Sequence, residues 1–185
     1  MAALVAFVFV GVVVFGGGGS GTGARGPKVG AVAPAFAAPL AASTLVGDAN
    51  ISTSACAVSD SRALVSCRAY SKGPLLLGFL ATDQPKCMGL VRSIIEVAAS
   101  HQGMSAAVIG IRGDRPPLAR VANANRGALV AWDRDGALTA RYGVAVCPTL
   151  VVVKRGGAVA GVLIGDGLEN PIVLSKRVDS LLGKA

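Results

Sequence analysis

The second half of the chain alternates between continuous apolar runs and stretches whose apolar residues recur at helical spacing. Residues 75–81 are apolar without interruption, which is typical of a strand buried on both faces of a sheet. Pro85 can open a helix in its first turn, and the pattern that follows predicts a helix closed by Gly103. The same reasoning predicts strands at 106–111 and 128–132, helices at 116–125 and 171–182, a short helix ending near 143, and a hairpin of 149–153 with 158–164. This order predicts an α/β fold with a mixed central sheet and helices on both faces.

The segment before the first buried strand has a different character. Residues 41–70 are polar and show no regular period, so they are expected to be irregular. They contain Cys56 and Cys67, which lie eleven positions apart. We expect these two cysteines to form a structural disulfide that closes the loop between them.

The N-terminus is apolar from Ala2 to Phe15 and continues into a Gly/Ser-rich stretch. Fourteen helical residues span about 21 Å, short of the ~30 Å hydrocarbon core of a bilayer. With Met1 and the glycines the segment could just cross, and it also fits the apolar region of a signal peptide. We therefore assign residues 1–20 to a membrane anchor or signal segment that forms an apolar helix, 21–33 to a linker, and 34–185 to the folded domain.

Composition and charge indicate the class of protein and argue against one kind of partner. The chain is 52% hydrophobic and 15% charged, which describes a globular protein with a large core. Its net charge is +8, but the basic residues are scattered singly, without the clustered footprint of a nucleic-acid site. We expect no nucleic-acid partner, and a basic surface facing an anionic membrane or wall instead. Arg25 and Lys28 follow the apolar run, and positive residues at this position favour a cytoplasmic location for the chain that follows. The cysteine usage described next favours the opposite side, so the orientation stays open.

The four cysteines, Cys56, Cys67, Cys87 and Cys147, contain no C-x-x-C pair, and the chain has one histidine. A structural zinc site usually takes paired cysteine or histidine ligands, so neither a metal nor another cofactor is expected. An even number of cysteines suits an oxidising compartment. This cysteine usage argues for a domain outside the cytoplasm.

Several segments match one known pattern in order and spacing. Gly30 with Ala33-Pro34-Ala35-Phe36 resembles a domain opening, and residues 72–82 (KGPLLLGFLAT) resemble a strand that leads into an active site. Residues 133–144 and 146–157 resemble the two segments that follow, the second of which contains a cis-proline. Together they resemble redoxin domains of the TlpA-like and AhpC/TSA-like kind, in the thioredoxin-like superfamily. The resemblance implies a thioredoxin fold over residues 30–184, with Pro148 as the cis-proline.

The active-site motif departs from that family. Its members carry W-C-x-x-C after the strand, and the aligned residues here are Asp83, Gln84, Pro85, Lys86 and Cys87. Gln84 occupies the position of the first cysteine, so dithiol chemistry within one C-x-x-C is excluded. The second cysteine, Cys87, remains at the start of a predicted helix, where free N–H groups stabilise a thiolate.

The resemblance implies a partner for Cys87. In the thioredoxin fold the residue before the cis-proline lies against the active-site motif, which places Cys147 near Cys87. We expect these two cysteines to form a redox-active pair, with Pro148 and Thr149 contacting the substrate. Alternatively, both are small buried hydrophobic residues, or Cys56 or Cys67 serves as the resolving cysteine for Cys87.

Three functions follow as alternatives. The first is a membrane-tethered, extracytoplasmic thiol-disulfide oxidoreductase that uses Cys87 with Cys147, and its partners are protein thiols or disulfides or a membrane electron donor. The second is a non-catalytic binding module of the same fold, which Gln84 in place of the nucleophile favours. The third is a one-cysteine thiol peroxidase, although Leu80 and Gln84 stand where that family has proline and threonine. The first function places the protein at the cell membrane by a single N-terminal anchor, or makes it a secreted protein.

Overall fold

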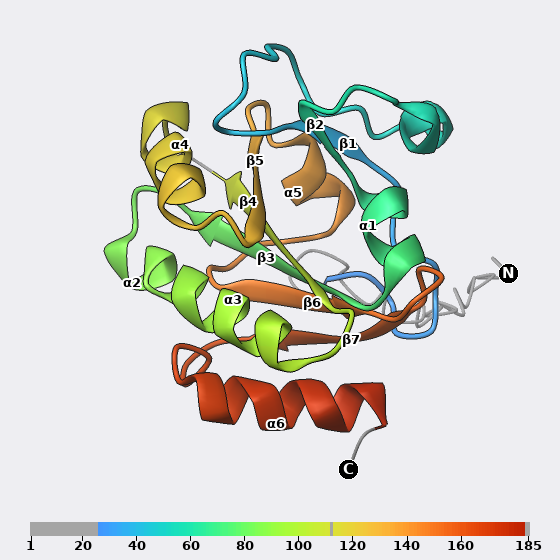
Figure 1. Cartoon of the computed structure of the whole chain (residues 1–185), viewed down its shortest axis with the longest axis vertical. Helices are drawn as coiled ribbons and strands as arrows, with labels where there is room; N and C mark the ends of the chain where they lie inside the picture. Colours follow the sequence, from blue (N-terminus) through green and yellow to red (C-terminus); the bar gives the residue numbers. More distant parts are fainter. Residues whose placement is uncertain (1–25, 112, 184–185) are drawn as a thin grey trace, which may run out of the picture.

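The computed structural model describes residues 26–111 and 113–183, which form a five-stranded mixed sheet between layers of helices (Figure 1). The strand order is β5-β4-β3-β6-β7, with β3 parallel to β4, β4 parallel to β5, and β6 antiparallel to both β3 and β7. The strands are β3 (Leu75–Ala81), β4 (Ser105–Ile111), β5 (Ala128–Asp133), β6 (Thr149–Val153) and β7 (Val159–Ile164). The mixed α/β sheet predicted from the sequence is confirmed.

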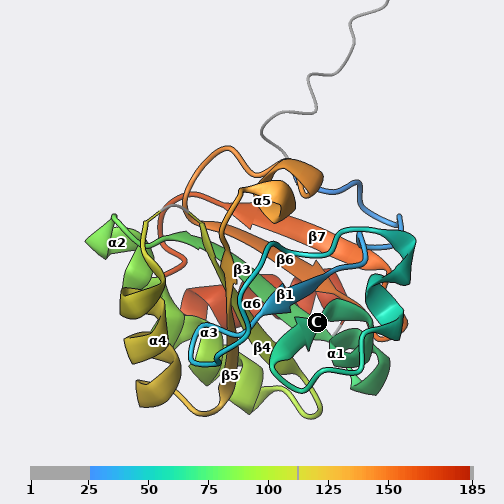
Figure 2. The same cartoon turned by 90° about the horizontal axis from the view of Figure 1, so that it is seen from above.

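Helices cover both faces of this sheet, as predicted (Figures 1 and 2). One face carries α3 (Leu90–Ser100), α4 (Arg115–Ala124) and α6 (Pro171–Leu182). The other carries α1 (Ser66–Lys72), α5 (Ala137–Arg141) and a small antiparallel sheet of β1 (Ala37–Pro39) and β2 (Ala63–Val65). Along β3, Leu75, Leu77 and Phe79 enter one core and Leu76 and Leu80 enter the other, since successive side chains of a strand point to opposite faces.

Two sequence predictions of local structure are wrong. Residues 41–70 are not irregular throughout, because they contain the 3-10 helix η1 (Thr53–Ala57), β2 and most of α1. A three-residue strand and a helix that follows Val65, with no side-chain cap, leave no periodic signal. The single helix expected after Pro85 is divided into α2 (Pro85–Met88) and α3, with the break at Gly89, a residue type at which helices commonly kink.

The N-terminal part of the described chain packs against the β6–β7 hairpin. Residues 26–33 belong to the linker assigned from the sequence, yet the Gly30 N–H donates to the Val159 carbonyl (2.9 Å) and the Ala33 N–H donates to the Gly157 carbonyl (2.8 Å). The anchor or signal segment assigned to residues 1–20, with its apolar helix, lies outside the described residues. Within the described ranges, no helix has the length and apolar character needed to cross a membrane.

Tyr142 closes the core beneath α5. Its ring packs against Phe36 and Phe79, and its hydroxyl donates to the Pro34 carbonyl at 2.7 Å. Burial raises the pKa of Tyr142 well above its ordinary value, because the charged phenolate would be desolvated. The neutral side chain therefore ties the start of the domain to α5.

We expect Tyr142→Phe to lower the free energy of unfolding by about 1 kcal/mol at neutral pH, because the Pro34 carbonyl loses its donor. In the unfolded chain Tyr142 ionises at the ordinary tyrosine pKa of 10.0, whereas in the folded protein its pKa is higher. The stabilisation is therefore fully present below pH 10 and is lost as the pH rises above it. Urea unfolding of both proteins, at neutral pH and at about pH 11, should show a steeper alkaline loss for the wild type. Equal losses in the two proteins would contradict this role of Tyr142.

Candidate active site

Cys87 and Cys147 meet where β3 ends. The structure joins them in a disulfide with a Cα–Cα separation of 6.1 Å, although they lie 60 positions apart. Cys87 belongs to α2, which follows β3, and Cys147 comes just before β6. Since β3 and β6 are antiparallel and Phe79 pairs with Thr149, the end of one strand lies beside the start of the other. The sheet register therefore brings the two cysteines together.

The entry into β6 is a defined turn. The Cys147–Pro148 peptide bond is cis. Thr149 is buried, and its hydroxyl donates to the Val146 carbonyl at 2.7 Å, which bridges the turn. Of the two residues expected to contact substrate, Pro148 faces a cavity at the site, whereas Thr149 supports the turn from within.

The loop that replaces the C-x-x-C motif is largely exposed. Asp83, Gln84 and Pro85 are exposed, and Pro85 is the first residue of α2. The Gln84 side-chain oxygen lies 3.4 Å from the Cys87 sulfur, so the residue at the position of the missing cysteine contacts the remaining one. The Lys86 side chain lies outside the described part of the structure.

Two cavities flank the disulfide. The larger, of about 600 Å³, is lined by Cys87, Cys147, Pro148 and Leu90, with Asp166 and Glu169 at its edge. The smaller, of about 290 Å³, is lined by both apolar and polar residues, among them Thr139 and Cys147, but not by Cys87. Gln84 lines both cavities. Side chains of a bound peptide could occupy these spaces on either side of Cys147.

The two sulfur atoms have different surroundings, which the sequence does not reveal. Cys87 is 3% exposed, whereas Cys147 is only partly buried. The Ala81 N–H donates to the Cys147 sulfur at 3.1 Å. Among the described residues, no group of three or more His, Cys, Asp or Glu side chains is placed to hold a metal ion.

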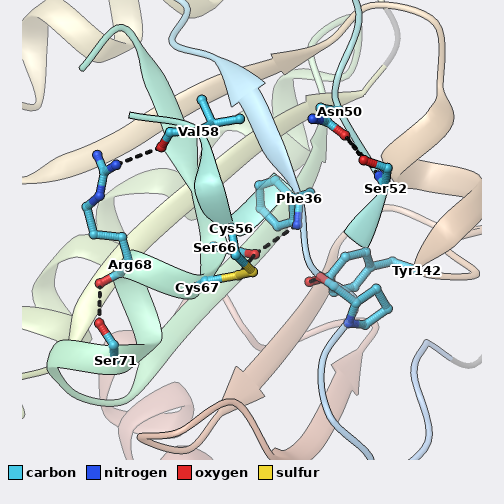
Figure 3. Close-up of a disulfide and its surroundings, with 11 residues drawn as sticks. Phe36, Asn50, Ser52, Cys56, Val58, Ser66, Cys67, Arg68, Ser71 and Tyr142 are labelled. Atoms are coloured by element: carbon cyan, nitrogen blue, oxygen red, sulfur yellow. Dashed lines mark hydrogen bonds between the residues drawn. A yellow bond between two sulfur atoms is a disulfide. The ribbon is translucent and has the colours of Figure 1, made fainter. Parts of the chain in front are cut away.

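A second disulfide joins Cys56 of η1 to Cys67 of α1, with a Cα–Cα separation of 5.5 Å (Figure 3). Hydrogen bonds surround it, including those from the Phe36 N–H to the Ser66 hydroxyl (3.0 Å) and from Arg68 to the Val58 carbonyl (2.8 Å). The helix α1, which holds Cys67, and α2 lie on opposite sides of the molecule (Figures 1 and 2). The seven residues of β3, about 20 Å in length, separate α1 from the active-site loop. The geometry thus gives no support to a resolving role for Cys56 or Cys67.

We expect the double variant Cys56→Ala/Cys67→Ala to lose about 2–3 kcal/mol of unfolding free energy, because the unfolded chain is no longer closed into a loop. The site at Cys87 should keep its structure and its reactivity. Urea unfolding, followed by circular dichroism, measures the loss. An unchanged free energy of unfolding would contradict a stabilising effect of this disulfide on the folded protein relative to the unfolded chain.

The element order, the cis-proline and the cysteine pair beside it define a domain with the thioredoxin fold. A scan of the chain against protein-family models gives no match, and a search of curated proteins gives none. Solved structures do match. A secreted disulfide oxidoreductase of Mycobacterium tuberculosis, homologous to E. coli DsbE, is 22% identical, with a TM-score of 0.55 over 64% of this chain and 88% of that one.

Two further solved structures share this fold. DsbF of M. tuberculosis is 27% identical, with a TM-score of 0.51 over 60% of this chain and 81% of that one. A thiol:disulfide interchange protein of Chlorobium tepidum is 17% identical, with a TM-score of 0.60 over 85% of this chain and 99% of that one. The chain therefore has the thioredoxin fold found in thiol:disulfide oxidoreductases.

Proposed function

We propose that the protein is a thiol-disulfide oxidoreductase whose redox centre is the Cys87–Cys147 pair. The observation that carries this proposal is the bond between these two cysteines at the end of β3, beside the cis-proline and between two cavities. Thiol-disulfide exchange needs an accessible sulfur, a partner sulfur and room for the incoming one. Because Gln84 stands where the first cysteine of a C-x-x-C motif would be, Cys147 provides the second sulfur of the pair from a distant part of the sequence.

Protein thiols and disulfides are the substrates of this proposal. The cavities beside Cys147 have room for the side chains that flank a substrate cysteine, and their lining is mostly apolar with a few polar groups, as in many binding sites. The solved structures of similar fold include a disulfide oxidoreductase and a thiol:disulfide interchange protein. In the reducing direction, a membrane electron donor would supply the two electrons that return the Cys87–Cys147 disulfide to the dithiol.

The proposed location is outside the cytoplasm, at the cell membrane through the N-terminal apolar segment, or secreted. All four cysteines of the chain are paired. Disulfides persist in oxidising compartments and are rare where glutathione and thioredoxin keep thiols reduced. The apolar run from Ala2 to Phe15 has the composition of an anchor or a signal peptide.

The test is catalysis of exchange by the full chain. A peptide with one disulfide and a fluorophore quenched in the oxidised form is mixed with reduced glutathione, with and without the protein at a tenth of the peptide concentration. The proposal expects faster reduction and repeated turnover. A rate equal to that of glutathione alone, with the protein shown to be folded, would overturn it.

A second function, a non-catalytic binding module, is favoured by Gln84. Its side chain is exposed, stands at the position of the missing nucleophile and lines both cavities. In this alternative the Cys87–Cys147 bond is permanent and the surface around it binds a partner. The same assay separates the two, because a permanent disulfide gives no turnover.

A further inference from the structure

We propose that Cys147 is the sulfur at which substrates enter and leave, and that Cys87 is the resolving cysteine. This inference rests on the oxidoreductase function proposed above and assigns a separate role to each sulfur. It follows from two differences between the cysteines: their access to solvent and the polarity of their hydrogen-bond partners.

Access distinguishes the two sulfurs first. Cys87 is 3% exposed, and Gln84 lies against its sulfur. Cys147 is partly buried and lines both cavities. The smaller cavity includes Cys147 and not Cys87, so a sulfur that enters there meets Cys147. Exchange rates depend on which sulfur can be reached, and access here favours Cys147.

Hydrogen bonding distinguishes them in the same direction. The Cys147 sulfur receives the Ala81 N–H at 3.1 Å, and a donor of this kind stabilises an anionic sulfur. Its acceptor neighbour, the Phe79 carbonyl, lies farther away, at 3.9 Å. The Cys87 sulfur faces the Gln84 carbonyl oxygen at 3.4 Å, an acceptor that a protonated thiol can bond and a thiolate cannot. The helix start expected to stabilise a Cys87 thiolate is only the four-residue α2, and the Cys87 N–H is paired with the Gln84 carbonyl. In the dithiol state, negative charge is therefore favoured on Cys147. The thiolate is the attacking species in exchange.

The resulting steps balance. In the reducing direction, the Cys147 thiolate attacks one sulfur of a substrate disulfide, which forms a mixed disulfide and releases the first substrate thiolate. Cys87 then loses its proton to solvent and attacks the Cys147 sulfur. The Cys87–Cys147 bond forms, and the second substrate sulfur leaves with the electron pair of the broken bond. Two electrons pass to the substrate, and the oxidising direction is the reverse.

The test compares Cys87→Ser with Cys147→Ser in the full chain, with the Cys56–Cys67 disulfide left intact. Each variant is mixed with dipyridyl disulfide, an uncharged probe whose pyridinethione product absorbs light, and mass spectrometry locates the adduct. We expect Cys87→Ser to react at Cys147 at least about tenfold faster than Cys147→Ser reacts at Cys87, and to retain the mixed disulfide. In urea the two rates should become equal, because the difference comes from the fold.

Because a serine at the buried position could disturb folding, Cys87→Ala serves as a second variant and circular dichroism checks both. If folded Cys147→Ser reacts as fast as folded Cys87→Ser, or faster, the role assignment is overturned while exchange by the wild type stands. If neither folded variant reacts and the wild type does not turn over the peptide, the inference and the proposed function both fall.

Discussion

The double variant Cys87→Ser/Cys147→Ser is expected to show no more disulfide exchange than the uncatalysed reaction, a loss of about a hundredfold or more, because a covalent mechanism cannot proceed without its nucleophile and partner. Both sulfurs of the redox centre are removed, while the sheet register that places the two positions side by side is kept. Exchange between the fluorescent peptide disulfide and reduced glutathione measures the loss.

The matched control removes the other pair. Cys56→Ser/Cys67→Ser also deletes two sulfurs and one disulfide, at the far end of β3. We expect its exchange rate to stay within about twofold of the wild type, since sites this far apart act independently. If the Cys87/Cys147 variant kept more than half of the wild-type rate, or if the control lost as much, the redox centre would be assigned to the wrong pair.

Arg115→Ala should cause the largest loss of stability outside the core, about 2–4 kcal/mol. The Arg115 guanidinium donates to four backbone carbonyls of residues 40–45, among them Leu45 at 2.7 Å and Leu40 at 2.8 Å. It also lies 5.8 Å from the ring centre of Trp132. Hydrogen bonds to a charged group contribute about 1.5–3 kcal/mol each, and in the variant the partly buried residues Leu40, Ser43 and Leu45 recover part of this from water. Urea unfolding measures the change.

Arg120→Ala is the control for that measurement. Arg120 is exposed on the same helix, and its replacement should change stability by no more than about 0.5 kcal/mol. Hydrogen exchange should show that Arg115→Ala frees the hydrogen-bonded amides of this segment, whereas Arg120→Ala leaves them protected; these are Leu40, Ala41, Ser43 and Leu45. Equal effects of the two substitutions would mean that residues 40–45 are held by other contacts.

The elements that the sequence predicted well are those whose burial follows a regular period. The run at Leu75–Ala81 and the amphipathic stretch at Pro171–Leu182 are a strand and a helix with the bounds expected. The elements that the sequence did not predict, β1, η1, β2 and α1, are short and lack such a period. Strand β2 pairs with β1, and the Cys56–Cys67 disulfide joins η1 to α1. The local sequence pattern is enough to predict the periodic elements, whereas tertiary contacts determine the short elements without a period.

The candidate site divides in the same way. Proximity of Cys87 and Cys147 was predicted through the family resemblance, and their redox role stays a prediction. Two differences could not be predicted because they depend on the fold. One is the burial of Cys87 against the partial burial of Cys147, and the other is the contact of their sulfurs with Gln84 and with the Ala81 N–H. Long-range links such as His101 to Asp179, at 2.9 Å between α3 and α6, likewise leave no signal in the sequence.

The most direct test of the redox centre is to equilibrate the full chain across a series of glutathione potentials, alkylate the free thiols and map the disulfides by mass spectrometry. We predict that Cys87–Cys147 opens and closes reversibly between about −120 and −270 mV, the range of disulfide oxidoreductases, while Cys56–Cys67 stays bonded to below about −300 mV. If Cys87 and Cys147 instead remain free thiols, or remain bonded, at every potential in the series, the pair is not a redox centre and the binding module becomes the better account.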